Sequence, residues 1–137
     1  MPLMTAAPSV QNTVPRRMPR FSPTREAAGL VFVSGQMAFD DQFQIIGADV
    51  VEQTRVCLKR IEAMLGTQGL SLADLVKTTV WLSRVDDFAA FDAAYGEELR
   101  GLTLPSRSTV RADLMVPGAL VEIEAVAQRP LAAISNA

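Results

Sequence analysis

The chain has 137 residues, of which 49% are hydrophobic and 20% charged, and its formal net charge at pH 7 is −2. This size fits one globular domain that can bury a core without disulfides or structural metals, and the charge gives no general attraction for nucleic acid. The absence of histidine and the single cysteine exclude Ser-His-Asp and Cys-His nucleophile systems, His-ligated metal sites and thiolate zinc clusters.

Residues 1–17 are rich in Pro, Ala, Ser and Thr and show no periodicity, which predicts a flexible tail. A single domain is expected over 18–132, followed by a short tail over 133–137. The basic cluster PRRMPR (15–20) is interpreted as a solvated arm rather than a phosphate-binding arm, because nothing downstream continues the patch. The sequence has neither a secretory signal pattern nor an apolar run of the roughly 20 residues that a membrane span needs, so we expect a cytoplasmic protein.

Two strands are expected near the start of the domain. LVFVSGQ (30–36) is a short apolar run ended by Ser-Gly, which predicts a buried strand. AFDDQFQIIG (38–47) has Asp-Asp in its middle and Gly at its end, which favours a hairpin that returns as a short strand. This acidic pair, like Asp86-Asp87 later in the chain, is typical of turns rather than of a magnesium site.

The next segment gives the strongest helix prediction. Asp49 can cap a helix that ends at the glycines of 66–69. The residues expected on the buried side of this helix recur at helical spacing. They are Val50, Thr54, Cys57, Leu58, Ile61 and Leu65. Cys57 is therefore expected to be a buried thiol.

The second half of the chain alternates strand and helix. Residues 71–85 open with a turn and become the strand VKTTVWL. Residues 86–99 predict a second helix, which Asp86 or Asp87 can cap, with a stripe of Phe88, Phe91, Tyr95 and Leu99. SRSTVRA and LVEIEAVAQ predict two further strands, joined around Pro117-Gly118.

This order of elements predicts an α+β two-layer sandwich, in which two helices cover one face of a mixed sheet of about six strands. The other face of the sheet would carry apolar side chains such as Val33, Val80, Leu82 and, depending on register, Val121 or Ile123. A chain this short has no third layer to cover them, so we expect it to associate with copies of itself.

Arg107 and Glu122 stand in segments that otherwise look like core strands. Arg107 follows a Leu-Pro-Ser turn and opens a strand. Glu122 and Glu124 alternate with apolar residues, so both glutamates are expected on one face of the sheet. From the residues alone, a surface salt bridge for Arg107 and a solvated acidic face for Glu122 stay open beside a role in a site.

Five segments of the chain resemble, in order and spacing, the RidA/YjgF family of small enamine and imine deaminases. They cover about residues 18–130 and are FSPTREAAGLVFVSGQ (21–36), LADLVKTTVWL (72–82), FDAAYGEEL (91–99), LPSRSTV (104–110) and VEIEAVA (121–127). The resemblance implies a chorismate-mutase-like fold that forms a homotrimer, with the sheets facing inward and three sites in the clefts between subunits. It also implies hydrolysis of 2-imino acids, formed from 2-aminoacrylate or 2-aminocrotonate, to 2-keto acids and ammonia, with neither metal nor cofactor.

The same resemblance implies roles for individual residues. Arg107 corresponds to the arginine that binds the substrate carboxylate, and Glu122 to the glutamate that positions the attacking water. Gly35 and Thr109 would line the pocket with Ser34 beside them, and Thr109 stands where many relatives carry cysteine.

Two further pocket positions depart from the family pattern. Phe21 stands where relatives commonly have tyrosine, so its ring can wall the pocket but a hydroxyl contact is lost. Asp92 replaces an asparagine common in the second helix, and it adds negative charge if it faces the site. Both changes bear on substrate preference more than on fold.

The chemistry of a 2-imino acid agrees with these roles. A guanidinium stays protonated, and its fork of donors matches a carboxylate in two places. Fixing the carboxylate also fixes the imine carbon, and a nearby glutamate can then accept a proton from the attacking water. Two alternatives stay open: deamination of a larger enamine such as 2-aminomuconate, and a non-catalytic trimer that binds small carboxylates. The sequence does not identify the preferred substrate.

Overall fold

The computed structural model describes residues 19–131; the predicted tails over 1–17 and 133–137 lie outside them, as does most of the basic cluster at 15–20. The helices and strands are β1 (Thr24–Ala27), β2 (Leu30–Gln36), α2 (Val50–Gly66), β3 (Leu75–Leu82), α3 (Phe88–Glu98), β4 (Ser106–Arg111) and β5 (Val121–Gln128), with short 3-10 turns η2 (Leu72–Asp74) and η3 (Val85–Asp87). No helix of this described part is long and apolar enough to cross a lipid bilayer.

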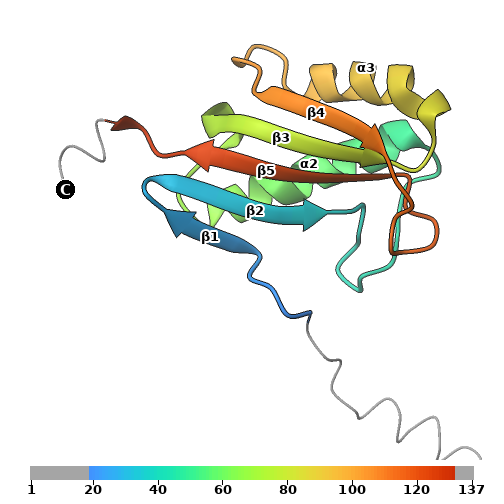
Figure 1. Cartoon of the computed structure of the whole chain (residues 1–137), viewed down its shortest axis with the longest axis horizontal. Helices are drawn as coiled ribbons and strands as arrows, with labels where there is room; N and C mark the ends of the chain where they lie inside the picture. The colour runs from blue at the N-terminus through green and yellow to red at the C-terminus, as the bar shows by residue number, and fades with distance from the viewer. Residues whose placement is uncertain (1–18, 132–137) are drawn as a thin grey trace, which may run out of the picture.

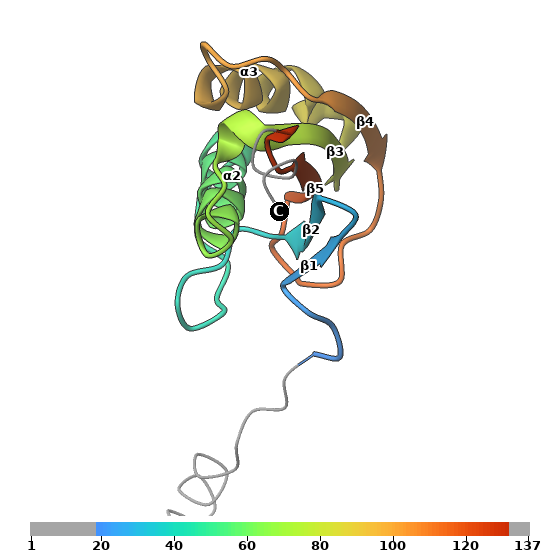
Figure 2. The ribbon, with the colours of Figure 1, turned by 90° about the vertical axis from the view of Figure 1, so that its left-hand side faces the viewer.

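The strands form one mixed sheet in the order β1-β2-β5-β3-β4, in which β3 and β4 run parallel and the other pairs antiparallel. Both helices lie on the same face of this sheet, α2 behind the central strands and α3 beside β4 (Figures 1 and 2). The predicted α+β sandwich with a mixed sheet is therefore confirmed. The last two strands of the sequence do not pair with each other, since β3 lies between them.

The sheet has five strands rather than about six, because residues 38–47 form no strand. Phe39 and Ile45 meet in a single isolated bridge. The carboxylate of Asp40 accepts hydrogen bonds from two backbone N–H groups of the same segment, at 2.8 and 2.9 Å. The segment therefore winds around this side chain instead of extending into a ladder.

Strand β1 was not expected from the sequence. It pairs with β2 through a two-residue turn, Ala28-Gly29, whose φ angles are +55° and +78°. Positive φ at both central residues gives a turn whose twist matches the strands that it joins. Glycine takes this conformation without strain, whereas Ala28 does so at a small cost.

Helix α2 begins as predicted, with the Asp49 carboxylate accepting a backbone N–H of the first turn at 2.9 Å. Its buried side contains all the predicted residues, Cys57 among them, together with Gln53. The Gln53 side chain donates to the carbonyl of Gly118 at 3.0 Å and accepts from the N–H of Leu120 at 2.9 Å. The helix thereby fixes the loop that leads into β5.

The apolar residues expected on the uncovered face of the sheet lie instead in the core. Val33, Val80, Leu82, Val121 and Ile123 are each at most 3% exposed and belong to one cluster with the helix side chains. The assignment was wrong because the period of two shows which residues share a face but not which face the helices cover.

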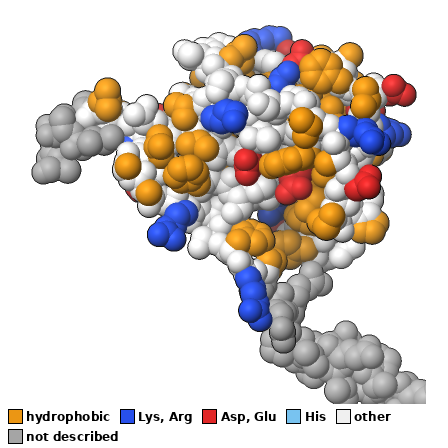
Figure 3. Space-filling model, in the orientation of Figure 1, with side chains coloured by type: hydrophobic (Ala, Val, Ile, Leu, Met, Phe, Trp, Pro, Cys, Tyr) orange, Lys and Arg blue, Asp and Glu red, His pale blue; other side chains and the backbone are white. Residues whose placement is uncertain are grey.

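The uncovered face carries the alternate residues of the same strands. Phe32 is 42% exposed, and Trp81 and Val126 are partly buried. Figure 3 shows hydrophobic side chains spread over this face, close to acidic ones. An apolar sheet surface of this kind is typical of one that another protein surface covers.

Candidate active site

Arg107 lies on the helix-covered side of the edge strand β4. It pairs in register with Thr78 of β3, whose hydroxyl is hydrogen-bonded to the Tyr95 hydroxyl of α3 at 2.7 Å. The guanidinium carbon lies 5.8 Å, 5.2 Å and 4.8 Å from the ring centres of Phe88, Phe91 and Tyr95. Cations at such distances from aromatic faces are attracted by about 0.5–2 kcal/mol each. The aromatic stripe of α3, predicted as core, therefore also walls this arginine.

Asp92 of α3 faces the same guanidinium. Its Oδ1 lies 2.9 Å from Nη1 of Arg107, and the two side chains are 52% and 21% exposed. Thr109 stands two residues after Arg107 on the same strand, so its side chain shares that face of the sheet. Its hydroxyl is buried and has no hydrogen-bond partner among the described residues. The structure thus brings together three of the predicted site residues, which we call the arginine group: Asp92, Arg107 and Thr109.

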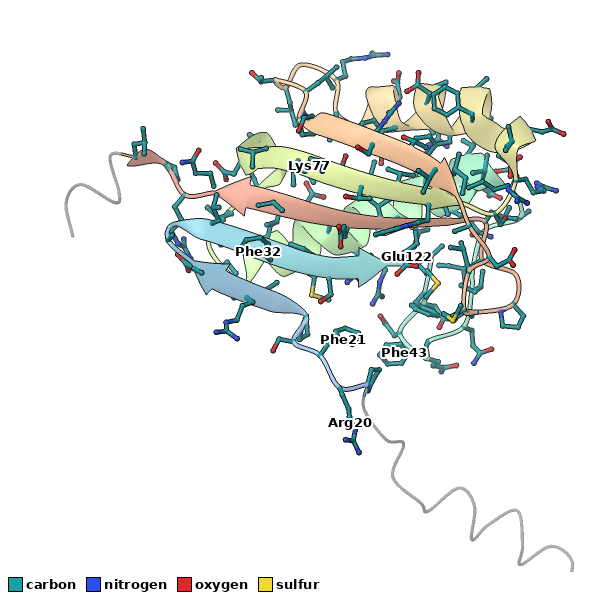
Figure 4. All side chains as sticks on the ribbon, viewed as in Figure 1. Arg20, Phe21, Phe32, Phe43, Lys77 and Glu122 are labelled. Carbon is teal, nitrogen blue, oxygen red and sulfur yellow. The ribbon has the colours of Figure 1, made fainter. Side chains whose placement is uncertain are left out.

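Glu122 and Gly35 form a second group, on the uncovered face of the sheet. A Cβ atom added to Gly35 would lie 2.3 Å from Oε2 of Glu122, so the carboxylate lies directly over the glycine backbone. Gly35 falls where the register of β2 with β5 shifts, between Val33 and Gln36. This irregularity exposes a stretch of backbone that a larger residue would cover. Figure 4 shows Glu122 beside the end of β2.

These two residues line a hollow of about 280 Å³, together with Trp81, Glu124 and the segment 112–115. Neither the segment 112–115 nor Trp81 was predicted to line the site. The alternation of Trp81 with Val80 and Leu82 could have indicated its face, but the return of 112–115 across the sheet is a loop path that no local pattern encodes.

Ser34 and Phe21 were both predicted to line the pocket. The Ser34 hydroxyl donates to the carbonyl of Ser22 at 2.7 Å, and Ser34 lines a neighbouring hollow of about 290 Å³ with Phe32 and Glu124, among other residues. Phe21 is 59% exposed and lines neither hollow. In this single chain the structure therefore does not bring Phe21 to the candidate site.

The local environment makes Glu122 a stronger proton acceptor than an ordinary glutamate. Burial, and then the charge of Glu124, raise the pKa of Glu122. Burial, followed by the nearby Glu122 charge, also raises the pKa of the Cys57 thiol. Cys57 is thus a core residue held as the neutral thiol and not a nucleophile.

The arginine group and the glutamate lie on opposite faces of the sheet. Arg107 pairs with Thr78 and Glu122 pairs with Trp81, and these two partners are three residues apart on β3. An odd separation along a regular strand places side chains on opposite faces. One chain therefore presents Arg107 and Glu122 on separate faces and does not bring them together.

Comparison with known proteins finds likeness over most of the chain. The family model described as Endoribonuclease L-PSP matches residues 12–129. A RutC family protein of Pyrococcus horikoshii is 34% identical over 116 residues, which cover 84% of this chain and 91% of the relative. The 2-iminobutanoate/2-iminopropanoate deaminase of Salmonella typhimurium is 33% identical over 106 residues, covering 76% and 83%. The crystal structure of E. coli TdcF with bound serine has a TM-score of 0.77 at 31% identity, covering 85% and 93%.

Proposed function

The chain belongs to the Rid/YjgF/L-PSP family, and on this premise we propose that it hydrolyses reactive 2-imino acids, formed from 2-aminoacrylate or 2-aminocrotonate, to 2-keto acids and ammonia. The observation that supports the proposal is a pair of side chains: Arg107, which is surrounded by aromatic rings, and Glu122, whose carboxylate lies over the backbone of Gly35. The relative named 2-iminobutanoate/2-iminopropanoate deaminase supports the reaction class. The relative crystallised with serine supports a small ligand that carries a carboxylate.

We also propose that the site forms between copies of this chain in a homotrimer. Arg107 and Glu122 face opposite ways within one chain, so a ligand that touches both needs a second copy. In a trimer whose uncovered faces turn inward, the edge strand β4 of one copy would lie against the uncovered face of the next. The exposed Phe32 on that face and the exposed Val110 on β4 support this arrangement, because both leave apolar surface unburied in the single chain.

Arg107 would bind the substrate carboxylate. Its guanidinium is permanently protonated, and the rings of Phe88, Phe91 and Tyr95 restrict the plane in which it lies. A carboxylate held in that plane fixes the adjacent imine carbon as well, which removes much of the entropy cost of the attack by water.

Glu122 would accept a proton from the water as its oxygen attacks the imine carbon. The C=N electron pair moves to nitrogen, which receives that proton from Glu122, and a carbinolamine results. Glu122 then takes the hydroxyl proton and passes it to the amino nitrogen, so that the C–N bond breaks as the C=O bond forms and ammonia leaves with the 2-keto acid as the other product. The raised pKa of Glu122 suits this exchange, since the carboxyl can take a proton and return it. The backbone at Gly35 and the unpaired hydroxyl of Thr109 are the further polar groups offered to the ligand.

A coupled assay tests the activity. An amino-acid oxidase or a PLP-dependent dehydratase generates the imino acid, and 2-keto acid release is followed with and without the purified chain. We expect acceleration by the wild type, and a loss of roughly 10²–10⁴-fold in Glu122→Gln, the usual contribution of general acid–base catalysis. Arg107→Ala should lose both turnover and 2-keto acid binding.

The same variants separate the enzyme from a non-catalytic carboxylate-binding trimer. Under the deaminase proposal, Glu122→Gln loses turnover and still binds a 2-keto acid. Keto-acid release no faster than in buffer, together with 2-keto acid binding that Arg107→Ala abolishes, would reject the enzyme and leave a binding protein. An assay with 2-aminomuconate tests the larger enamine.

A further inference from the structure

The guanidinium proposed to bind the substrate already contacts a carboxylate of its own chain. Nη1 of Arg107 lies 2.9 Å from Oδ1 of Asp92, which is half exposed. Among residues 19–131, Asp92 is the only carboxylate that pairs with this guanidinium. One edge of the arginine is therefore occupied, while its remaining N–H donors are open to a ligand.

A second carboxylate can reach Arg107 in two ways, and both cost affinity. It can displace Asp92, which breaks a charge-assisted contact. It can instead take the free donors and share the guanidinium, which brings two negative charges close together on one cation. Because Asp92 is 52% exposed, its side chain has room to move into solvent when it is displaced.

We propose that Asp92 is a specificity-determining residue that competes with the ligand carboxylate for Arg107. This inference rests on the proposed function and concerns the same site. Asp92 weakens the binding of simple monocarboxylates, the 2-keto acid product included, so the product leaves readily. It also disfavours ligands that depend on the carboxylate alone.

Binding of 2-ketobutyrate to the full-length protein tests the proposal by calorimetry. Asp92→Asn and Asp92→Ala should each bind it about threefold to fivefold more tightly than the wild type, the upper part of the range expected for removing a competing, partly exposed ion pair. Asp92→Ala removes the competing carboxylate without adding an amide. It therefore shows whether tighter binding comes from the lost competition or from the amide donor that Asp92→Asn introduces. In turnover, KM should fall in both variants by more than kcat changes.

Glu97→Gln is the matched control, because it removes one negative charge and an ion pair, with Arg100, from the same helix. Its affinity should stay within about twofold of the wild type. Adding Arg107→Ala to Asp92→Ala should abolish the gain. The proposal is overturned by equal or weaker binding in Asp92→Ala, by a gain that survives loss of Arg107, or by no binding in any of these proteins.

The two proposals fail in different ways. Tighter 2-ketobutyrate binding in both Asp92 variants of a protein that hydrolyses no imine would reject the deaminase and keep the competition. Imine hydrolysis by the wild type with no gain in the variants would reject the competition alone.

Discussion

Arg107 is partly buried among side chains that suit a guanidinium. Aromatic faces of α3 attract the flat cation, and Asp92 supplies a counter-charge at one edge. A lysine would keep the charge but lose both the planar stacking and the two-point grip on a carboxylate. We therefore expect that position 107 requires the planar geometry of arginine and not only a positive charge.

Gly35 offers the sharpest residue-scale prediction. In Gly35→Ala the new Cβ would lie 2.3 Å from Oε2 of Glu122, so the carboxylate must move away. We expect imine hydrolysis to fall at least tenfold while the fold is retained, because the clash is relieved by a side chain rather than by backbone. Turnover in the coupled assay and the far-ultraviolet circular dichroism spectrum measure the two effects.

Gly96→Ala is the control for this change. Gly96 lies inside α3, and nothing stands within 4 Å of the Cβ position. This substitution should stabilise the helix by up to about 1 kcal/mol and leave turnover unaffected. Full activity in Gly35→Ala would mean that the position of the Glu122 carboxylate does not matter for catalysis.

Helix α3 packs against the core and also contacts Arg107, whereas the sequence indicated only the first of these roles. Phe91 and Tyr95 are buried against the core, as the apolar stripe predicted. The same helix also supplies the wall and the counter-charge of Arg107. Its start is less well fixed than that of α2, because Asp87 makes no capping hydrogen bond and its carboxylate pairs with Arg84 at 3.0 Å.

The two predicted helix caps should therefore differ in their effect on stability. Asp49→Ala removes a side chain that caps α2 and should lower the free energy of unfolding by about 1 kcal/mol. Asp87→Ala removes no cap but an ion pair of this partly buried carboxylate with the 61% exposed Arg84, and should cost about 0.5 kcal/mol or less. Urea denaturation at one fixed protein concentration measures both. Equal losses would contradict the capping geometry.

At the scale of the whole molecule, the uncovered face of the sheet decides whether a complete site can exist. It holds Phe32, Trp81 and Val126 beside the carboxylates of Glu122 and Glu124. Figure 4 shows Phe32, Lys77 and Glu122 on the strands of this face, away from α2. Burial of these residues against other copies would exclude bulk solvent from the proposed site. It would also bring the arginine group of a neighbouring copy to Glu122.

Phe32→Glu tests this arrangement. The variant places a charge in the proposed interface, so we expect it to be monomeric, in contrast to the trimer proposed for the wild type, and to lose imine hydrolysis. Mass measurement by light scattering after size-exclusion chromatography gives the answer. Val85→Glu, at a position 66% exposed in η3, is the control and should keep the wild-type mass. If the wild type is monomeric and still hydrolyses imines, the proposal of a site between subunits is wrong.

Much of the fold followed from local pattern. The period of α2 with Asp49 at its start and the alternation in β5 each describe one segment, and the structure agrees with both. Of the stripe predicted for α3, Phe91, Tyr95 and Leu99 are buried, whereas Phe88 is 44% exposed. The segment 38–47 failed as a strand because its own Asp40 side chain competes for the backbone N–H groups. The cytoplasmic location stays a prediction.

The two helices, the buried side of α2 and the common face of Glu122 and Glu124 could be predicted from the amino-acid pattern, because these features depend on spacing along a few residues. The tertiary structure was needed to show that the helices cover the face of Val121, that β3 separates β4 from β5, and that Asp92 meets Arg107. It also placed Arg107 and Glu122 on opposite faces of the sheet. These features depend on the pairing register between segments that are distant in the sequence. The residues of one strand do not specify the register of its neighbours.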